Sequence, residues 1–174
     1  MVQSINSTQK IEETDGLPMP KRIWAVVSVG FALCMSVLDI NIVNIVLPTL
    51  SHDFGTSPAV TTWIINGYQL AIVISLLSFS ALGEIIGYRK VYLSGIGLFC
   101  ITSLICALSD SFWTLTIARI FQGFSASAIT SVNTAQLRYI YPKSQLGRGM
   151  GINAMVVAIS AAAGPSVASG ILSI

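Results

Sequence analysis

The sequence has little charge, a single histidine and three cysteines, and each shortage excludes a class of protein. Only 9% of the 174 residues are charged, against about 25% in a soluble domain. His52 alone cannot build most hydrolase or metal arrangements. Cys34, Cys100 and Cys106 lie in apolar runs without metal-ligating spacing. We therefore expect no metal site, no cofactor and no enzyme, and a net charge of +2 is too small to indicate a nucleic-acid partner.

Long apolar runs are what the sequence has in abundance. Hydrophobic residues make up 53% of the chain, and the mean hydropathy is +0.78. These values predict an all-α, polytopic membrane protein. Five runs have the length that crosses a hydrocarbon core of about 30 Å. They predict transmembrane helices at about 23–47, 62–82, 91–108, 112–132 and 150–174. Trp63 and Tyr68, near the start of the second helix, are expected as interfacial anchors.

The distribution of basic residues predicts the orientation. Residues 1–22 are polar and end in Lys21 and Arg22, which predicts a disordered tail. The apolar run after them lacks a cleavage site, which argues against a signal peptide. Lys and Arg also occur between helices two and three and between helices four and five, but not in the other two loops. Because such residues mark the cytoplasmic side, we expect a cytoplasmic N-terminus and a multi-pass protein of the plasma membrane, in bacteria the cytoplasmic membrane.

Arg119 lies inside the fourth predicted helix without an acidic neighbour in the sequence. An arginine in hydrocarbon costs between roughly 2.5 and more than 10 kcal/mol, so it is expected to face the protein interior and to find a partner. Asp39 in the first helix lies at a matching depth, roughly 10 to 13 Å beneath the outer surface at 1.5 Å per residue. We expect the two to pair directly, or each to be met by polar neighbours such as Gln122, Asn41 or Gln69.

Further polar and small residues follow Arg119 along the fourth helix at intervals of three, four and seven. They form a stripe that is expected to face inward, although hydrogen-bonded helix packing alone would also explain its amides. The stripe consists of Arg119, Gln122, Gly123, Ala126, Thr130 and Asn133. Across the chain, the candidates for lining a polar cavity are Asn41, Asn44, Gln69, Gln122 and Asn133.

The fifth predicted helix carries small residues at every fourth position. This pattern predicts a seam that lets another backbone approach closely, as helix packing alone would require and as a sliding surface in a transporter would also require. Gly164-Pro165 removes a helical hydrogen bond and predicts a bend or pivot. The seam consists of Ala154, Ala158, Ala162, Ser166 and Gly170.

Four segments together resemble a known family. Residues 38–48, Leu-Asp-Ile-Asn-Ile-Val-Asn-Ile-Val-Leu-Pro, are similar to the first-helix signature of drug:proton antiporters. Residues 82–90, residues 115–127 with Arg119-x-x-Gln-Gly, and Gly164-Pro165 are similar to its loop, fourth-helix and fifth-helix motifs. The chain from residue 23 to residue 174 therefore resembles the major facilitator superfamily, in particular its fourteen-helix drug:proton antiporters.

The chain departs from the family pattern at several positions. Asn41 replaces a threonine of the first-helix signature. The remaining departures are Ser80, Glu84, Ile85 and Tyr88 in the connector and Ser160, Ala168 and Ser169, in place of glycines, in the fifth helix.

The resemblance implies a proton-coupled efflux antiporter for small lipophilic or cationic compounds, with Asp39 and Arg119 taking part in substrate binding and proton coupling. It implies a conformational role for Gly83, Glu84, Gly87, Arg89, Lys90, Gly123, Gly164 and Pro165. Residues 23–174 would form five helices of a six-helix N-terminal bundle, so we expect a fragment or truncated product that is inactive without its C-terminal helices. The expected partners are the bilayer, a small-molecule substrate and the proton. The alternative is a structural or assembly membrane protein in which Asp39 and Arg119 only lock helices together.

Overall fold

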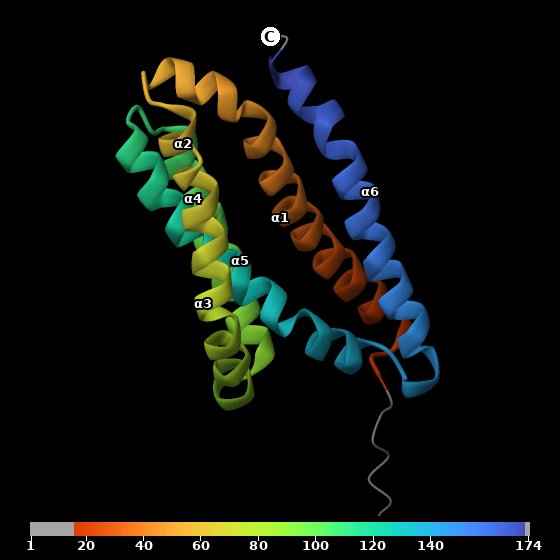
Figure 1. Ribbon diagram of the computed structural model, residues 1–174. Helices are drawn as coiled ribbons and strands as arrows, with labels where there is room; N and C mark the ends of the chain where they lie inside the picture. Colours follow the sequence, from red (N-terminus) through yellow and green to blue (C-terminus); the bar gives the residue numbers. More distant parts are fainter. Residues whose placement is uncertain (1–15, 173–174) are drawn as a thin grey trace, which may run out of the picture.

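The computed structural model describes residues 16–172, which are almost entirely helical (Figure 1). The elements are α1 (Met19–Asp53), α2 (Pro58–Thr61), α3 (Trp63–Ile86), α4 (Tyr88–Ala107), α5 (Phe112–Ile140), the 3-10 helix η1 (Lys143–Gln145) and α6 (Leu146–Leu172). Of the predicted tail, residues 1–15 lie outside the described residues, as do residues 173–174 of the fifth predicted helix. The predicted all-helical fold is confirmed.

By length and composition, four segments of the described chain can cross a membrane. They are Met19–Asp53, Pro58–Ile86, Tyr88–Ala107 and Lys143–Gly170. Helix α5 is 29 residues long but less apolar, because it contains many polar residues, several of which are buried inside the bundle. Its buried polar residues are Thr116, Arg119, Gln122, Ser125, Ser127 and Asn133.

The predicted ends of the first and fourth helices are wrong. Helix α1 begins at Met19, inside the predicted tail, since Pro20 suits the first turn of a helix, where its missing N–H is not needed. At the other end α1 continues through Pro48, because a proline within a membrane helix bends the helix without having to end it. Figure 1 shows α1 curving at that end. Helix α5 continues to Ile140, beyond the predicted end at residue 132.

The prediction of a polar loop between helices two and three is also wrong. Gly83 and Glu84 belong to α3, whereas Arg89 and Lys90 belong to α4, so only Gly87 separates the two helices. The backbone of Gly87 has φ +99°, a conformation that a side chain would strain. A single glycine therefore reverses the chain between two long helices.

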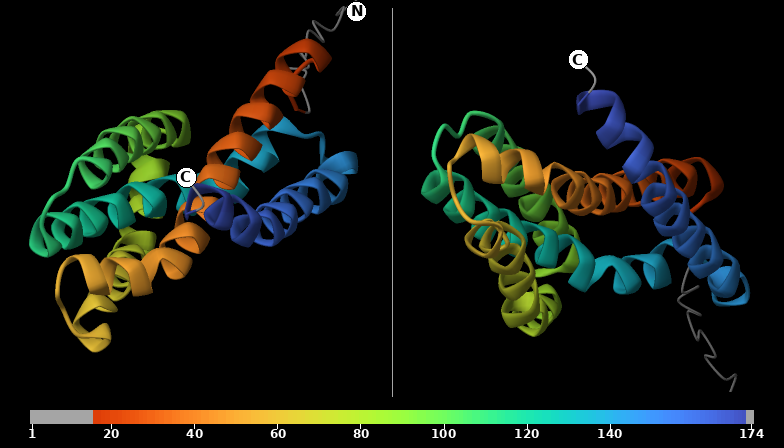
Figure 2. Two further views of the ribbon diagram at one scale, coloured as in Figure 1. Left: turned by 90° about the horizontal axis from the view of Figure 1, so that it is seen from above. Right: turned by 45° about the horizontal axis from the view of Figure 1, so that its top comes forward.

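Helix α5 lies at the centre of the arrangement. It packs most extensively against α3 and α4, while α1 and α6 lie side by side and α1 also reaches α5 (Figures 1 and 2). The largest apolar cluster joins α1, α3, α4 and α5, and within it the Tyr92 hydroxyl donates to the carbonyl oxygen of Ser28 at 3.0 Å. Val73, Leu77 and Ile85 are exposed on α3, which suits a surface that contacts lipid tails.

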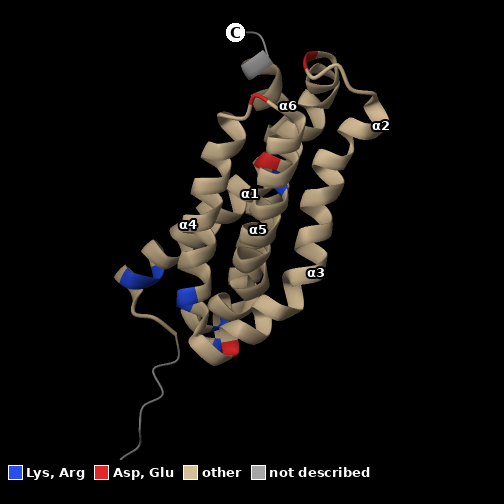
Figure 3. Ribbon diagram, turned by 90° about the vertical axis from the view of Figure 1, so that its left-hand side faces the viewer, with Lys and Arg blue, Asp and Glu red and all other residues tan. Residues whose placement is uncertain are grey.

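Basic side chains gather at one end of the bundle, which we call the basic end (Figure 3). There the backbone N–H of Leu17 donates to the carbonyl oxygen of Ile140 at 3.1 Å. Arg22 donates to the carbonyl oxygen of Leu17 through Nε and Nη2, and to Gln145 Oε1 through Nη1. The start of α1 is therefore tied to the connection between α5 and α6. The basic end carries Lys21, Arg22, Arg89, Lys90, Arg138, Lys143 and Arg148.

Helix α6 contacts α1 along a line beside the predicted seam. Ser160, Gly164 and Ala168 are buried, and a Cβ added to Gly164 would lie 2.6 Å from Asn41 Cβ. The five seam residues are all exposed. The small residues that admit α1 were therefore not the ones that the four-residue spacing singled out, because the spacing does not say which face a neighbouring helix will cover.

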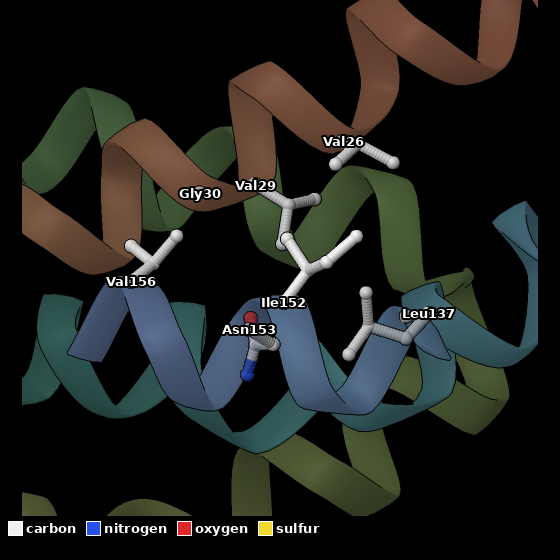
Figure 4. A pocket seen from close by; sticks show the side chains of 8 residues that line it. Val26, Val29, Gly30, Leu137, Ile152, Asn153 and Val156 are labelled. Carbon is white, nitrogen blue, oxygen red and sulfur yellow. The ribbon is translucent and has the colours of Figure 1, made fainter. Parts of the chain in front are cut away.

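A small apolar cavity lies between α1, α6 and the end of α5 (Figure 4). Asn153 is its only polar side chain. Its lining reaches no nearer to Asp39 along α1 than Gly30, about 13 Å away at 1.5 Å per residue. The lining residues are Val26, Val29, Gly30, Leu137, Gly149, Ile152, Asn153 and Val156. The cavity is therefore separate from the buried charges.

Gly123 sets the distance between α5 and α3. A Cβ at this position would collide with the backbone carbonyl oxygen of Tyr68 and lie 2.9 Å from Ala71 Cβ. Since backbone cannot move aside as a flexible side chain does, Gly123→Ala should lower the free energy of unfolding by about 1 to 3 kcal/mol. Gly97 is the matched control, because a Cβ there meets nothing within 4 Å, and Gly97→Ala should be neutral or stabilising. Thermal unfolding in detergent micelles, followed by circular dichroism, measures both, and equal effects would contradict this account of Gly123.

Candidate functional site

The site centres on Arg119, which the i, i+3 geometry of α5 places on the same face as Gln122. Arg119 Nη1 donates to Asp39 Oδ2 of α1 at 2.6 Å. Asp39 lies 17 residues along α1 from Arg22, about 25 Å at 1.5 Å per residue, so the pair is away from the basic end. Of the two arrangements that the sequence left open, the structure shows direct pairing.

Gln122 closes the pair into a ring of hydrogen bonds. Its Oε1 accepts from Arg119 Nη1 at 2.7 Å, and its Nε2 donates to Asp39 Oδ1 at 3.1 Å. The amide therefore makes a hydrogen bond to each charged partner in one orientation. Cys106 of α4 joins the ring, since its Sγ–H donates to Gln122 Oε1 at 3.4 Å. Three helices thus supply the polar groups of the site.

Tyr68 of α3 contributes an aromatic face. Its ring centroid lies 4.5 Å from Cζ of Arg119, within the range in which a guanidinium is attracted to a ring. The close approach of α3 and α5 at Gly123, one turn beyond Arg119, brings the ring there. The prediction of Tyr68 as an interfacial anchor is wrong, because the residue is 1% exposed and faces α5. Trp63, five residues earlier, does lie on the outside of the bundle.

The two charged side chains differ in their access to the surroundings. The Asp39 side chain is 19% exposed and the Arg119 side chain 3%. The carboxylate is therefore the more accessible of the two charged groups, while the guanidinium is covered by protein.

The other predicted cavity residues do not join this ring. Asn41 and Asn44 donate to the backbone carbonyl oxygens of Val37 and Ile40 within α1. Gln69 is exposed on α3. Asn133 is buried, and its Oδ1 has no hydrogen-bond partner among residues 16–172. Polar character and helical spacing identified these residues, but only Gln122 also had the depth and rotation that reach Asp39.

The predicted conformational residues fall into two groups. Glu84, Arg89 and Lys90 are exposed near the basic end, and no ion pair joins them in the described part of the chain. The motif glycines instead mark close contacts between helices: Gly83 against Tyr88, Gly123 against Tyr68 and Gly164 against Asn41. Gly164 and Pro165 lie inside a continuous α6.

Sequence reasoning missed two members of the site, Tyr68 and Cys106. An aromatic residue near a helix start is typical of an anchor, and a cysteine in an apolar run is typical of packing, so neither residue type pointed to the charges. For Tyr68 the available signal was depth, because it lies about as far from the outer end of its predicted helix as Arg119 does from that of its own. Cys106 lies near the outer end of its predicted helix, so depth would not have pointed to it.

Five long helices with a buried arginine–aspartate pair define a multi-pass membrane protein. Residues 29–174 match the model of the Major Facilitator Superfamily, and the chain belongs to this family of transporters.

Related proteins support this assignment. The uncharacterized transporter YebQ of Escherichia coli is 53% identical over 162 residues, which cover 93% of this chain and 35% of that protein. The riboflavin transporter RibZ of Clostridioides difficile is 31% identical, covering 87% of this chain and 34% of that protein. The tetracenomycin C resistance and export protein of Streptomyces glaucescens is 34% identical, covering 87% of this chain and 28% of that protein. The chain thus spans about a third of the length of these relatives.

Removing one charge of the pair should destabilise the chain more than neutralising both. Asp39→Asn leaves a buried guanidinium without its counter-ion, which should cost about 3 to 5 kcal/mol of unfolding free energy. Adding Arg119→Gln removes the stranded charge and retains hydrogen-bonding amides, so the double variant should recover much of the loss. Asp53→Asn, at an exposed acid of the same helix, is the control and should have little effect. Denaturant titration in micelles measures all three, and a double variant less stable than Asp39→Asn would refute a coupled pair.

Proposed function

We propose that this chain forms the first five helices of the N-terminal bundle of a proton-coupled efflux antiporter for small lipophilic or cationic compounds. The observation that carries the proposal is the buried ion pair of Asp39 and Arg119, in which only the carboxylate has an exposed edge. Membership of a transporter family and similarity to an exporter of tetracenomycin C support the same conclusion.

Asp39 is the group proposed to change partners. Its carboxylate accepts from Arg119 and Gln122, and an arriving proton or cationic substrate would compete with these donors. A buried pair is costly to open from one side alone, because the remaining charge stays uncompensated. Opening would therefore be linked to the arrival of a second group at the site, which is the requirement for exchange of one ligand for another.

Arg119 and Gln122 are proposed to remain as the fixed part of the site. Both are almost fully buried, and both lie on the central helix α5. Gln122 Oε1 accepts from Arg119, so the guanidinium keeps a hydrogen bond when Asp39 is engaged elsewhere. The close contacts at Gly123 and Gly164 are proposed to transmit a change at this site to α3 and α6.

The test is efflux by the full-length protein that contains this chain. Asp39→Asn and Arg119→Gln should each reduce efflux of a fluorescent lipophilic cation to that of cells lacking the protein, since exchange needs both the titratable acid and its fixed counter-ion. Asp110→Asn, at an exposed acid in the loop before α5, should transport normally. Unchanged efflux in both site variants, at equal membrane levels, would favour the alternative in which the pair only locks helices together.

We also propose that the basic end faces the cytoplasm of a bacterial cell and that the membrane is its plasma membrane, because basic residues mark the cytoplasmic side. In a variant without the native cysteines, His52→Cys should react with a membrane-impermeant maleimide in intact cells. Ser144→Cys at the basic end should react only after permeabilisation, and both positions are exposed. The reverse pattern would overturn this orientation.

A further inference from the structure

Tyr68 has a position that the ion pair alone does not explain. Its side chain is 1% exposed, and its ring lies 4.5 Å from Cζ of Arg119. The hydroxyl oxygen is buried and finds no hydrogen-bond partner in the portion of the chain that the structure describes. Leucine would fill the space without burying an unpaired hydroxyl, which is normally unfavourable. The packing of α3 on α5 therefore does not by itself account for an aromatic residue here.

The contacts of Arg119 show what the ring can supply. Nη1 donates to both Asp39 and Gln122, whereas Nε is buried without a partner among residues 16–172. If Asp39 turns to another ligand, one neutral acceptor and one aromatic face remain around a cation that is 3% exposed. An aromatic face attracts a cation most strongly when water is excluded, as it is here.

The location of the ring is also fixed independently of Asp39. Tyr68 belongs to α3, whose backbone contacts α5 at Gly123, while Asp39 belongs to α1. A movement of α1 relative to α5 would separate Asp39 from Arg119 but leave Tyr68 and Gln122 in place. The guanidinium thus has one partner on α1, and two, Tyr68 and Gln122, on the helices that pack together at Gly123.

We propose that Tyr68 is a positioning residue that retains Arg119 in the site while Asp39 exchanges partners, with the ring face providing the attraction. The proposal rests on the proposed role of Asp39 as the exchanging group.

The test is a double-mutant cycle on the purified chain in micelles, with Asp39→Asn standing for the released state. Tyr68→Leu removes the ring and Tyr68→Phe keeps it. We expect Tyr68→Leu to lower Tm by several degrees more in the Asp39→Asn background than in the unsubstituted chain, because the ring then compensates Arg119 without the carboxylate. Tyr68→Phe should show no such difference. Adding Arg119→Gln to the Asp39→Asn background should abolish the extra loss, since no cation remains to be held.

If the ring only fills space, Tyr68→Leu should lower Tm equally in both backgrounds, and that result would overturn the proposal. A Tyr68→Phe variant as damaging as Tyr68→Leu would also overturn it. If Tyr68→Leu yields too little folded protein, Tyr68→Met keeps a similar volume without a ring and takes its place. The cycle does not depend on transport. Additive Tm losses together with abolished efflux in Asp39→Asn would refute the role of Tyr68 and leave the proposed function standing.

Discussion

The need to neutralise one buried guanidinium governs this structure. Arg119 lies on the central helix, and a charge there is tolerated only with a counter-ion and hydrogen-bond acceptors close by. Asp39, Gln122 and the ring of Tyr68 meet this need from three helices, and Gly123 permits the close helix contact that brings Tyr68 into place. The packing of α1, α3 and α5 around one another therefore follows from the same electrostatic requirement.

Large apolar side chains cover the outside of this bundle, and polar side chains are buried beside its apolar core. Helix α5 buries arginine, glutamine, asparagine, serine and threonine, while Val73, Leu77 and Ile85 of α3 face outward. Lipid tails attract these outer side chains no less than a protein interior would, so apolar surface alone cannot hold the helices together. Close contacts at glycines and hydrogen bonds between helices become the main sources of specificity.

The rise per residue of a helix made Asp39 a candidate partner for Arg119, although it left separate polar neighbours open as the alternative. The existence of five long helices could be predicted outright, because it depends on a local quantity, the length of apolar runs. Helix ends could not, since Pro48 bends α1 without ending it and Gly87 alone replaces an expected loop. Tyr68 and the contact face of α6 were missed for a related reason. Both depend on which neighbour covers a given side of a helix, and helical periodicity does not contain that information.

The distance between the two charges along the chain has a consequence for biosynthesis. Asp39 and Arg119 are 80 residues apart, and a ribosome adds about 5 to 20 residues per second. The first helix therefore exists for roughly 4 to 16 s before its partner is synthesised. During that interval the Asp39 side chain must be hydrated, contact the translocation machinery or be protonated. Assembly of this bundle thus depends on when Arg119 is synthesised as well as on the complementary charges of the pair.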